Sequence, residues 1–292
     1  MLLVLRADGR AGMSDGGRDD DRPAEPPSGV HPLGERPMPD LAPLGAPSPS
    51  PPPDMPKAKP RPRSARPLWR RVLMLLVKAA IAFVAGSLLW VLAYRFVNPP
   101  ITLTMIGDIV AGHGVTKRWM PLSRIDPSMA RAVIGAEDSR FCQHDGFDLE
   151  AIEQAYKRNQ RGGRIRGGST ISQQTAKNVF LWQGGGYFRK ALEAWFTLLI
   201  ENIWGKRRIM EVYLNVAETG IGTYGVNAGA MRYFKHDASR LTDREAAQIA
   251  AVLPLPKKRA AIAPRGFTRR YANAISRRIG VVAGDGLDAC LR

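Results

Sequence analysis

The sequence predicts an all-α domain that follows a single membrane-spanning helix. One long apolar segment lies in the first third of the 292 residues. After it, capping signals and apolar residues at helical spacing recur, whereas the alternating pattern of strands is scarce. These observations divide the chain into a tail over residues 1–66, an anchor over residues 67–98 and one folded domain over residues 99–292.

The N-terminal tail is dominated by Pro, Gly, Ser, Asp and Arg, and it includes the proline-rich run Ser48–Pro53. Such a composition cannot bury enough apolar surface to offset the chain entropy that folding removes. We therefore expect residues 1–66 to be disordered.

The apolar segment Val72–Tyr94 predicts a transmembrane helix, because a helix of this length crosses a bilayer core of about 30 Å. Its one charge, Lys78, lies near the N-terminal end, where the long side chain can reach the interface. A buried core helix of a soluble protein is the alternative, but the segment is almost continuously apolar and has no amphipathic period.

The basic residues predict the direction of the span. After the span, Arg95 is the single basic residue before Asp108. Before it the basic residues are Lys57, Lys59, Arg61, Arg63, Arg66, Arg70 and Arg71. The positive-inside rule places this flank in the cytoplasm and everything after Phe96, including the folded domain, outside.

The formal charge of +17 admits nucleic acid, an anionic membrane surface or a phosphate-bearing substrate as partners. Because the folded domain is expected across the membrane from the cytoplasm, we exclude nucleic acid.

Capping residues predict the first helices of the folded domain. Asp126, followed by Pro127 in the first turn, opens a helix that runs toward Glu137. A second helix is expected from Asp148, and a third with Ser169 as its N-cap.

A longer helix is expected over Phe188–Trp204, with Gly205 as an interruption and Lys206–Asn215 as its continuation. Thr242 and Glu245 form a capping box before the next apolar helix.

The C-terminal part contains a helix that ends at Pro254 and a last helix from about Thr268. The two cysteines, Cys142 and Cys290, form no C-x-x-C motif and no Cys/His cluster, so no zinc site is indicated. A bridge between them is conceivable, but we expect two free thiols.

Four stretches place polar residues where a simple core does not need them. The first, residues 137–148, carries Glu137, Asp138, Phe141 and His144 at the end of an apolar helix. Element ends commonly hold catalytic groups. A solvated helix end with an acidic pair is the alternative interpretation.

In the second stretch, residues 167–178, two glycines lead into a helix start. Its polar residues are Ser169, Thr170, Gln174, Lys177 and Asn178. Backbone N–H groups, the helix dipole and a lysine two turns on can hold a phosphate. A plain N-cap fits the same residues.

The third stretch places Arg189 and Lys190 on the helix face of Glu193. A surface salt bridge is the simple interpretation, yet the apolar neighbours favour a cleft. In the fourth stretch, residues 206–215, Tyr213 and Asn215 are candidates to support the site from behind.

In order and spacing, the four stretches resemble the motifs of family 51 glycosyltransferases: E-D-x-x-F-x-x-H-x-G-x-D, G-x-S-T-I-x-Q-Q-x-x-K-N, R-K-x-x-E and K-x-x-I-x-x-x-Y-L-N. The resemblance spans about Met120 to Leu253. It implies a helical, lysozyme-like fold with a small membrane-associated lobe. It also implies polymerisation of lipid II, the lipid-linked precursor of peptidoglycan, outside the cytoplasmic membrane.

The chain contains no Ser-x-x-Lys, the acylating motif of a transpeptidase, and ends shortly after the motifs, so it resembles the monofunctional biosynthetic type. Two residues depart from the family pattern: Thr197 replaces a usual Ala, and Ile200 a usual Leu. The family's last motif, a basic helix, is only loosely matched by residues 269–278.

By the resemblance, Glu137 is the general base and Glu193 the second essential glutamate. The expected substrate-binding residues are Asp138, Phe141, His144, Ser169, Thr170, Gln174, Lys177, Asn178, Arg189 and Lys190. No cofactor is required, although a divalent cation such as Mg²⁺ can assist at the diphosphate. Expected partners are lipid II, the growing lipid-linked glycan and the membrane, with other wall-synthesis or division proteins as further candidates.

Two other function classes fit parts of the sequence. A lysozyme-like hydrolase also needs paired carboxylates, but it does not need the cations Lys177, Arg189 and Lys190. A non-catalytic division scaffold needs only the span and a helical domain, so the glutamates Glu137 and Glu193 argue against it.

Overall fold

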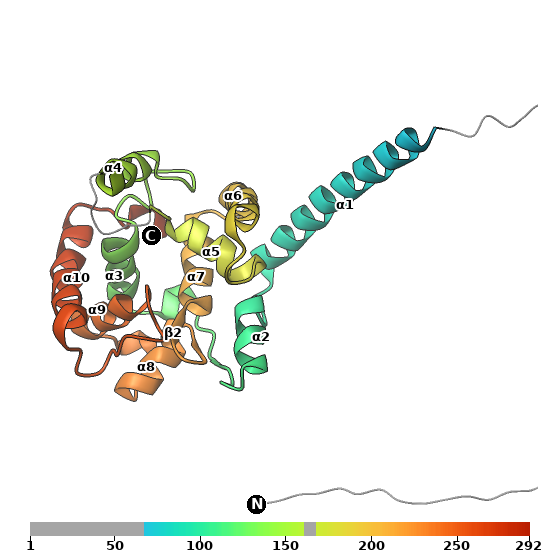
Figure 1. The fold of residues 1–292 in the computed structure, drawn as a ribbon. Coiled ribbons are helices and arrows are strands. Elements are labelled where there is room, and N and C mark those ends of the chain that lie inside the picture. Colours follow the sequence, from blue (N-terminus) through green and yellow to red (C-terminus); the bar gives the residue numbers. More distant parts are fainter. Residues whose placement is uncertain (1–66, 161–167) are drawn as a thin grey trace, which may run out of the picture. The chain divides into compact units, whose positions relative to one another are not determined.

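The computed structural model describes residues 67–160 and 168–292. The expected tail lies outside these residues, and so does Gly167 of the second stretch. Helices dominate the described part, which confirms the all-α class (Figure 1). The helices are α1 Leu68–Phe96, α2 Leu103–Val110, α3 Pro127–Glu137, α4 Leu149–Gln160, α5 Ile171–Phe180, α6 Gly186–Ile203, α7 Lys206–Val216, α8 Val226–Phe234, α9 Asp243–Val252 and α10 Gly266–Gly284.

One small sheet accompanies the helices in the described ranges. Its strands are β1 Thr116–Lys117, β2 Glu218–Gly220 and β3 Thr223–Tyr224, in the order β1-β3-β2. β1 runs parallel to β3, and β2 runs antiparallel to it. Short 3-10 turns cover Leu122–Arg124, Ala238–Arg240 and Ala289–Leu291.

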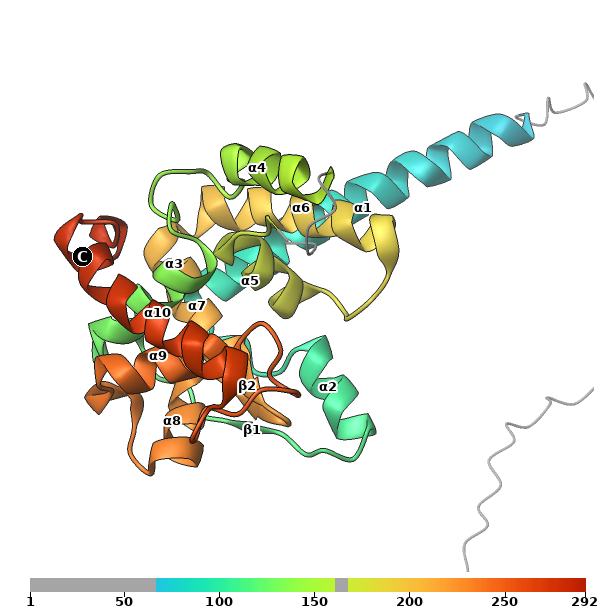
Figure 2. The same cartoon turned by 60° about the vertical axis from the view of Figure 1, so that its left-hand side comes forward.

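The core forms where α3 packs against α9 and α10, and where α5 packs against α6 and α7 (Figure 2). Fully buried apolar side chains join the two groups, among them Met129, Ile171, Ile209 and Ile249. Burying a side chain of this size contributes roughly 1.5–3 kcal/mol. The stacked core thereby fixes the ends of α3 and α5, which carry the first two polar stretches.

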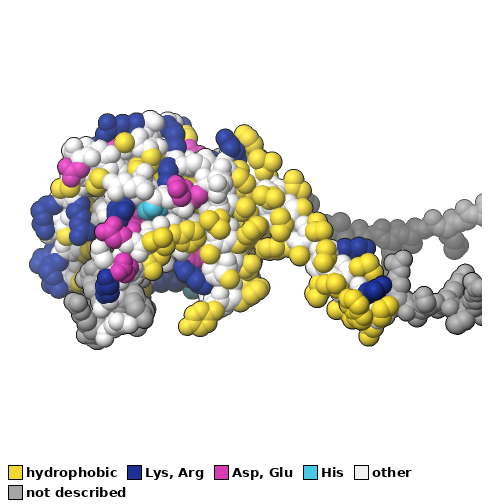
Figure 3. All heavy atoms as spheres, turned by 90° about the horizontal axis from the view of Figure 1, so that it is seen from above, with side chains coloured by type: hydrophobic (Ala, Val, Ile, Leu, Met, Phe, Trp, Pro, Cys, Tyr) yellow, Lys and Arg dark blue, Asp and Glu magenta, His cyan; other side chains and the backbone are white. Residues whose placement is uncertain are grey.

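The predicted span is one helix, α1, which begins four residues before Val72 and ends two residues after Tyr94. Among the described residues it is the one helix long and apolar enough to cross a membrane. Only Ser87 and Val91 are buried on it, and apolar side chains are exposed along its length (Figure 3).

The C-terminal half of α1 packs on the domain. The Trp204 indole donates a hydrogen bond of 2.7 Å to the Val91 carbonyl, and the Trp90 ring meets the Phe180 ring edge-on at 5.3 Å. The anchor is therefore joined directly to α5 and α6, the helices that carry the second and third stretches.

Two local predictions are wrong. The N-cap of α5 is Thr170 rather than Ser169, because Thr170 and Gln173 form a reciprocal capping box. Cys142 and Cys290 are joined in a disulfide rather than free. The C-terminal turn after α10 returns to the end of α3, which brings together two residues that are 148 positions apart. A closed loop of this length stabilises a fold by about 5 kcal/mol in the chain-entropy model.

Candidate active site

The centre of the site is Glu137, the last residue of α3. Its carboxylate accepts a hydrogen bond of 2.9 Å from the Gln174 side-chain amide. The oxygen of that amide accepts a bond of 3.3 Å from the hydroxyl of Tyr213 on α7. The buried Tyr213 thus fixes the orientation of Gln174, and Gln174 fixes that of Glu137, as the fourth stretch predicted.

Burial raises the pKa of Glu137 above its ordinary value, because the charged form loses solvation. The hydrogen bond from Gln174 and the charges of Arg259 and Lys177 oppose this shift. A carboxylate with a raised pKa is a stronger proton acceptor, which suits a general base near neutral pH.

Asp138, Phe141 and His144 follow Glu137 in the chain, and their side chains are buried. Asp138 accepts hydrogen bonds of 3.0 Å from the Ile171 backbone N–H and from His144 Nε2. The Gly146 N–H donates to His144 Nδ1 at 3.1 Å, so the neutral ring carries its proton on Nε2. Asp138 thus joins the end of α3 to the start of α5, and direct contact of the three residues with substrate stays a prediction.

The hydroxyl groups of Thr170 and Ser169 also form hydrogen bonds at the start of α5. Thr170 Oγ1 donates to the Gly146 carbonyl at 2.6 Å and accepts from the Gln173 N–H. Ser169 Oγ accepts a 3.3 Å bond from Lys190, which links α5 to α6. Thr197 fills the space beside Gly146, whose added Cβ would meet it at 2.8 Å, and the Thr197 hydroxyl bonds the Glu193 carbonyl.

The third stretch forms a charged cluster around Glu193, which is only 3% exposed. Arg189 donates to one carboxylate oxygen at 2.7 Å, and Lys190 donates to the other. The interpretation as a surface salt bridge is therefore wrong for the carboxylate, because burial removes the screening that weakens surface pairs.

Lys177 interacts electrostatically with both Glu193 and Glu137. Burial is the main reason that the pKa of Lys177 is lowered, and the charges of Arg189 and Lys190 lower it further. The charges of Glu193 and Glu137 oppose this shift. Lys177, Arg189 and Lys190 together with the single carboxylate of Glu193 carry a net formal charge of +2. Such a cluster can bind a dianionic group such as a diphosphate.

A pocket of about 350 Å³ opens beside this cluster. The predicted residues in its lining are Gln174, Lys177, Asn178 and Tyr213. Asn215 lies behind it, where its amide bonds the backbone N–H and carbonyl of Met120 at 2.8 Å each.

Glu218, Tyr224 and Lys257 also line the pocket, and the sequence did not predict them. Burial raises the pKa of Glu218 to about 7, and the charge of Lys257 opposes this shift. Lys257 and Tyr224 bind the buried Asp108 at 2.6 Å and 2.7 Å. The sequence has no pattern that predicts contact between residues of α2, the strands and the segment after α9.

The described residues contain no group of three or more His, Cys, Asp or Glu side chains that could hold a metal ion. Assistance by a divalent cation therefore stays a prediction.

Comparison with known proteins identifies this arrangement of motifs. A family model described as transglycosylase matches residues 104–280. The chain belongs to the transglycosylase family. The match covers α3, α5, α6 and α7, and thus all four polar stretches.

Proteins named biosynthetic peptidoglycan transglycosylase are similar over most of the chain. One from Caulobacter vibrioides is 49% identical over 78% of this chain and 99% of the relative. One from Xanthomonas campestris pv. campestris strain B100 is 48% identical over 74% of this chain and 91% of the relative. One from Rhodospirillum centenum is 46% identical over 77% and 96%. The chain is therefore a peptidoglycan glycosyltransferase, an enzyme of cell-wall synthesis.

Proposed function

We propose that the enzyme polymerises lipid II into β-1,4-linked glycan strands, with inversion at the anomeric carbon and release of undecaprenyl diphosphate. The observation that carries the proposal is the arrangement around Lys177. Glu137, a partly buried carboxylate with a raised pKa, and Glu193 with its paired cations both act electrostatically on Lys177. A displacement at a lipid-linked sugar needs these two functions, a base and charge stabilisation for the leaving group.

The reaction is one displacement. The 4-hydroxyl oxygen of the acceptor attacks the anomeric carbon of the donor, and Glu137 accepts the hydroxyl proton. The bond from that carbon to the diphosphate oxygen breaks, and its electron pair leaves with the diphosphate. Lys177, Arg189 and Lys190 stabilise the departing charge, while Glu193 holds the last two in place. A divalent cation at the diphosphate is an optional addition that supplies further charge.

We further propose that the domain works on the periplasmic face of the inner membrane, with α1 as a single-pass anchor and the N-terminus in the cytoplasm. The basic flank before α1 supports this direction. The Cys142–Cys290 disulfide supports it independently, because such bonds persist in oxidising compartments. A reporter active only in the periplasm should work when fused after Arg292 and be silent when fused before Trp69. The reverse pattern would contradict the orientation.

Labelled lipid II tests the activity directly. The detergent-solubilised protein should produce glycan polymer on a gel, and Glu137→Gln should not. Glu153→Gln is the matched control, because Glu153 is exposed on α4 and pairs only with Lys157 among the described residues. Cleavage of preformed glycan without polymer formation would replace the proposal with a hydrolase.

A further inference from the structure

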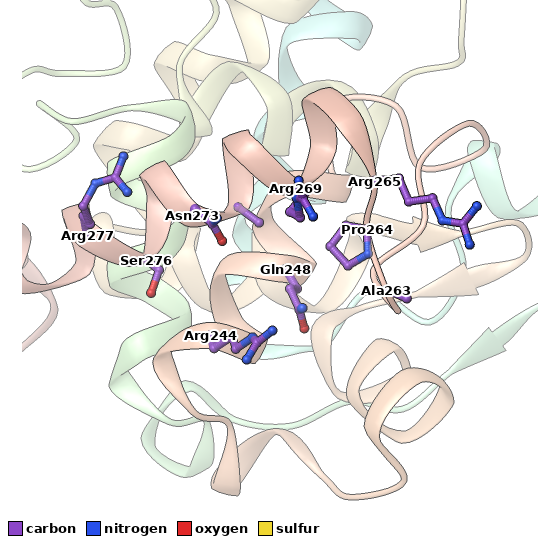
Figure 4. A pocket seen from close by; sticks show the side chains of 10 residues that line it. Arg244, Gln248, Ala263, Pro264, Arg265, Arg269, Asn273, Ser276 and Arg277 are labelled. Atoms are coloured by element: carbon purple, nitrogen blue, oxygen red, sulfur yellow. The ribbon is translucent and has the colours of Figure 1, made fainter.

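A second cavity is larger than the pocket that Gln174 and Lys177 line, which we call the catalytic pocket. It has a volume of about 770 Å³ and lies between α9, α10 and residues 263–265 (Figure 4). Four arginines line it: Arg244, Arg265, Arg269 and Arg277. We call this cavity the arginine groove.

The helical register produces the groove. Arg269 and Arg277 lie two turns apart on α10, on the face opposite Ile275, which is buried in the core. Arg244 and Gln248 lie one turn apart on α9 and face them. α10 buries one face in the core, so Arg269 and Arg277 lie on its exposed face, beside α9.

The groove has no negative charge in its lining. Within residues 67–160 and 168–292, none of its four arginines forms an ion pair, whereas Arg131, Arg189 and Arg208 elsewhere each bind a carboxylate. Four unopposed charges around one cavity create a positive potential that attracts an anion. A planar guanidinium binds a carboxylate in a bidentate manner, so the expected ligand carries carboxylates or phosphates.

The groove is close to the catalytic pocket along the chain. Arg259 acts electrostatically on Glu137 and lies over the rings of Phe267 and Tyr271 at the start of α10. Arg265 follows six residues later, so the two backbones are at most about 20 Å apart. A polymer that passes Arg259 toward the start of α10 therefore comes within about 20 Å of Arg265, in the lining of the groove.

The groove is also remote from the membrane anchor. α1 packs on α6, whereas α10 packs on α3 and α9, and Figure 1 places α10 at the side of the domain away from α1. This placement favours a ligand in the periplasm over the headgroup of an anionic lipid.

We propose that the arginine groove binds the carboxylates of the peptide stems on the nascent glycan strand as the strand leaves the catalytic pocket. The inference rests on the proposed function, since that function defines the strand. Asn273 and Gln248 supply neutral donors and acceptors for the hydroxyls and amides of the same ligand. A strand held here stays on the enzyme between successive additions.

Binding can be measured without turnover, with the full-length protein in detergent. The probe is a lipid-free glycan oligomer with its peptide stems, and the comparison is the same oligomer after enzymatic removal of the stems. We expect the intact oligomer to bind at least about tenfold more tightly, which is the effect of losing one charge-assisted contact. Equal affinity for the two oligomers would overturn the proposal.

Charge reversal locates the contact. The double variant Arg269→Glu/Arg277→Glu should lose about a hundredfold in affinity for the intact oligomer. Arg244→Ala, on the other helix, should lose about tenfold, so the inference does not depend on the fold of one variant. The matched control is Arg240→Glu, an exposed arginine four residues before Arg244 that does not line the groove. Unchanged binding in both groove variants would overturn the assignment.

Two further arms separate the alternatives. Phosphatidylglycerol in mixed micelles should not displace the oligomer, and displacement would assign the groove to a lipid surface instead. In the lipid II assay the double variant should start at the wild-type rate and release shorter strands; unchanged strand length would overturn the retention role. A wild-type protein that makes no polymer refutes the proposed function, whereas polymer formation without oligomer binding refutes only the groove.

Discussion

Two carboxylates act electrostatically on Lys177, the partly buried Glu137 and the buried Glu193, and their surroundings differ. Glu193 is bound by two cations, Arg189 and Lys190. Glu137 is bound by a neutral amide, from Gln174, and burial raises its pKa. A carboxylate with a neutral partner and a raised pKa is well suited to accept a proton, whereas one paired with two cations can hold those cations in place. The proposed mechanism therefore gives proton transfer to Glu137 and the organisation of positive charge to Glu193.

The largest expected effect is that of Glu137→Gln. The amide is nearly isosteric but cannot accept the proton, so polymerisation should fall by about 10²–10⁴-fold, the usual contribution of a positioned base. Thermal stability should change little. A variant that keeps more than about a tenth of the wild-type rate would remove Glu137 from this role.

Arg189→Ala should have the next largest effect. If Arg189 holds the diphosphate, turnover should fall by at least about tenfold, and affinity for a phosphoglycolipid that mimics the donor should fall with it. Arg189→Lys should restore only part of the rate, because an ammonium does not reproduce bidentate binding. Unchanged polymerisation and inhibitor affinity would return Arg189 to a structural role.

A smaller effect is expected on the pH dependence. The base must be ionised, so the rate falls as the pH drops through the pKa of Glu137. Gln174→Leu removes the hydrogen bond that lowers this pKa, so the acidic limb of kcat/KM should move to higher pH. An acidic limb at the wild-type position would show that Gln174 does not tune the base.

The smallest effect is expected at Glu218. Because the pKa of Glu218 is about 7 in the fold and lower in the unfolded chain, the fold holds this proton more tightly. Its contribution to stability is full at low pH and is lost as the pH rises toward 7. Glu218→Gln should flatten this dependence, with a difference of roughly 2–4 °C in Tm if about 1 kcal/mol is involved. Parallel stability curves would contradict the assignment.

Local signals explain what the sequence predicted well. Asp126 caps α3, and Thr242 with Glu245 caps α9, because these bonds join residues close in sequence. The predicted motif residues Glu137 and Gln174 do meet, since their helices carry them on fixed faces.

Long-range contacts explain what the sequence did not predict. The strands of the small sheet are two or three residues long, too short for an alternating pattern. Asp108 and Lys257 meet across 149 residues, and the disulfide closes across a similar separation. Helix α8 begins after Gly225, which has a positive φ and lacks the side chain that would mark a cap.

Inhibitor binding to the two glutamine variants tests the division of roles most directly. The affinity of a phosphoglycolipid donor mimic is measured for Glu137→Gln and Glu193→Gln by the same titration. Glu137→Gln should bind the mimic within about twofold of wild type while lacking turnover, because the cations keep Glu193 as their partner. Glu193→Gln should lose at least about tenfold in affinity, since Arg189 and Lys190 lose the carboxylate that positions them. Equal losses in the two variants, or full affinity in Glu193→Gln, would contradict it.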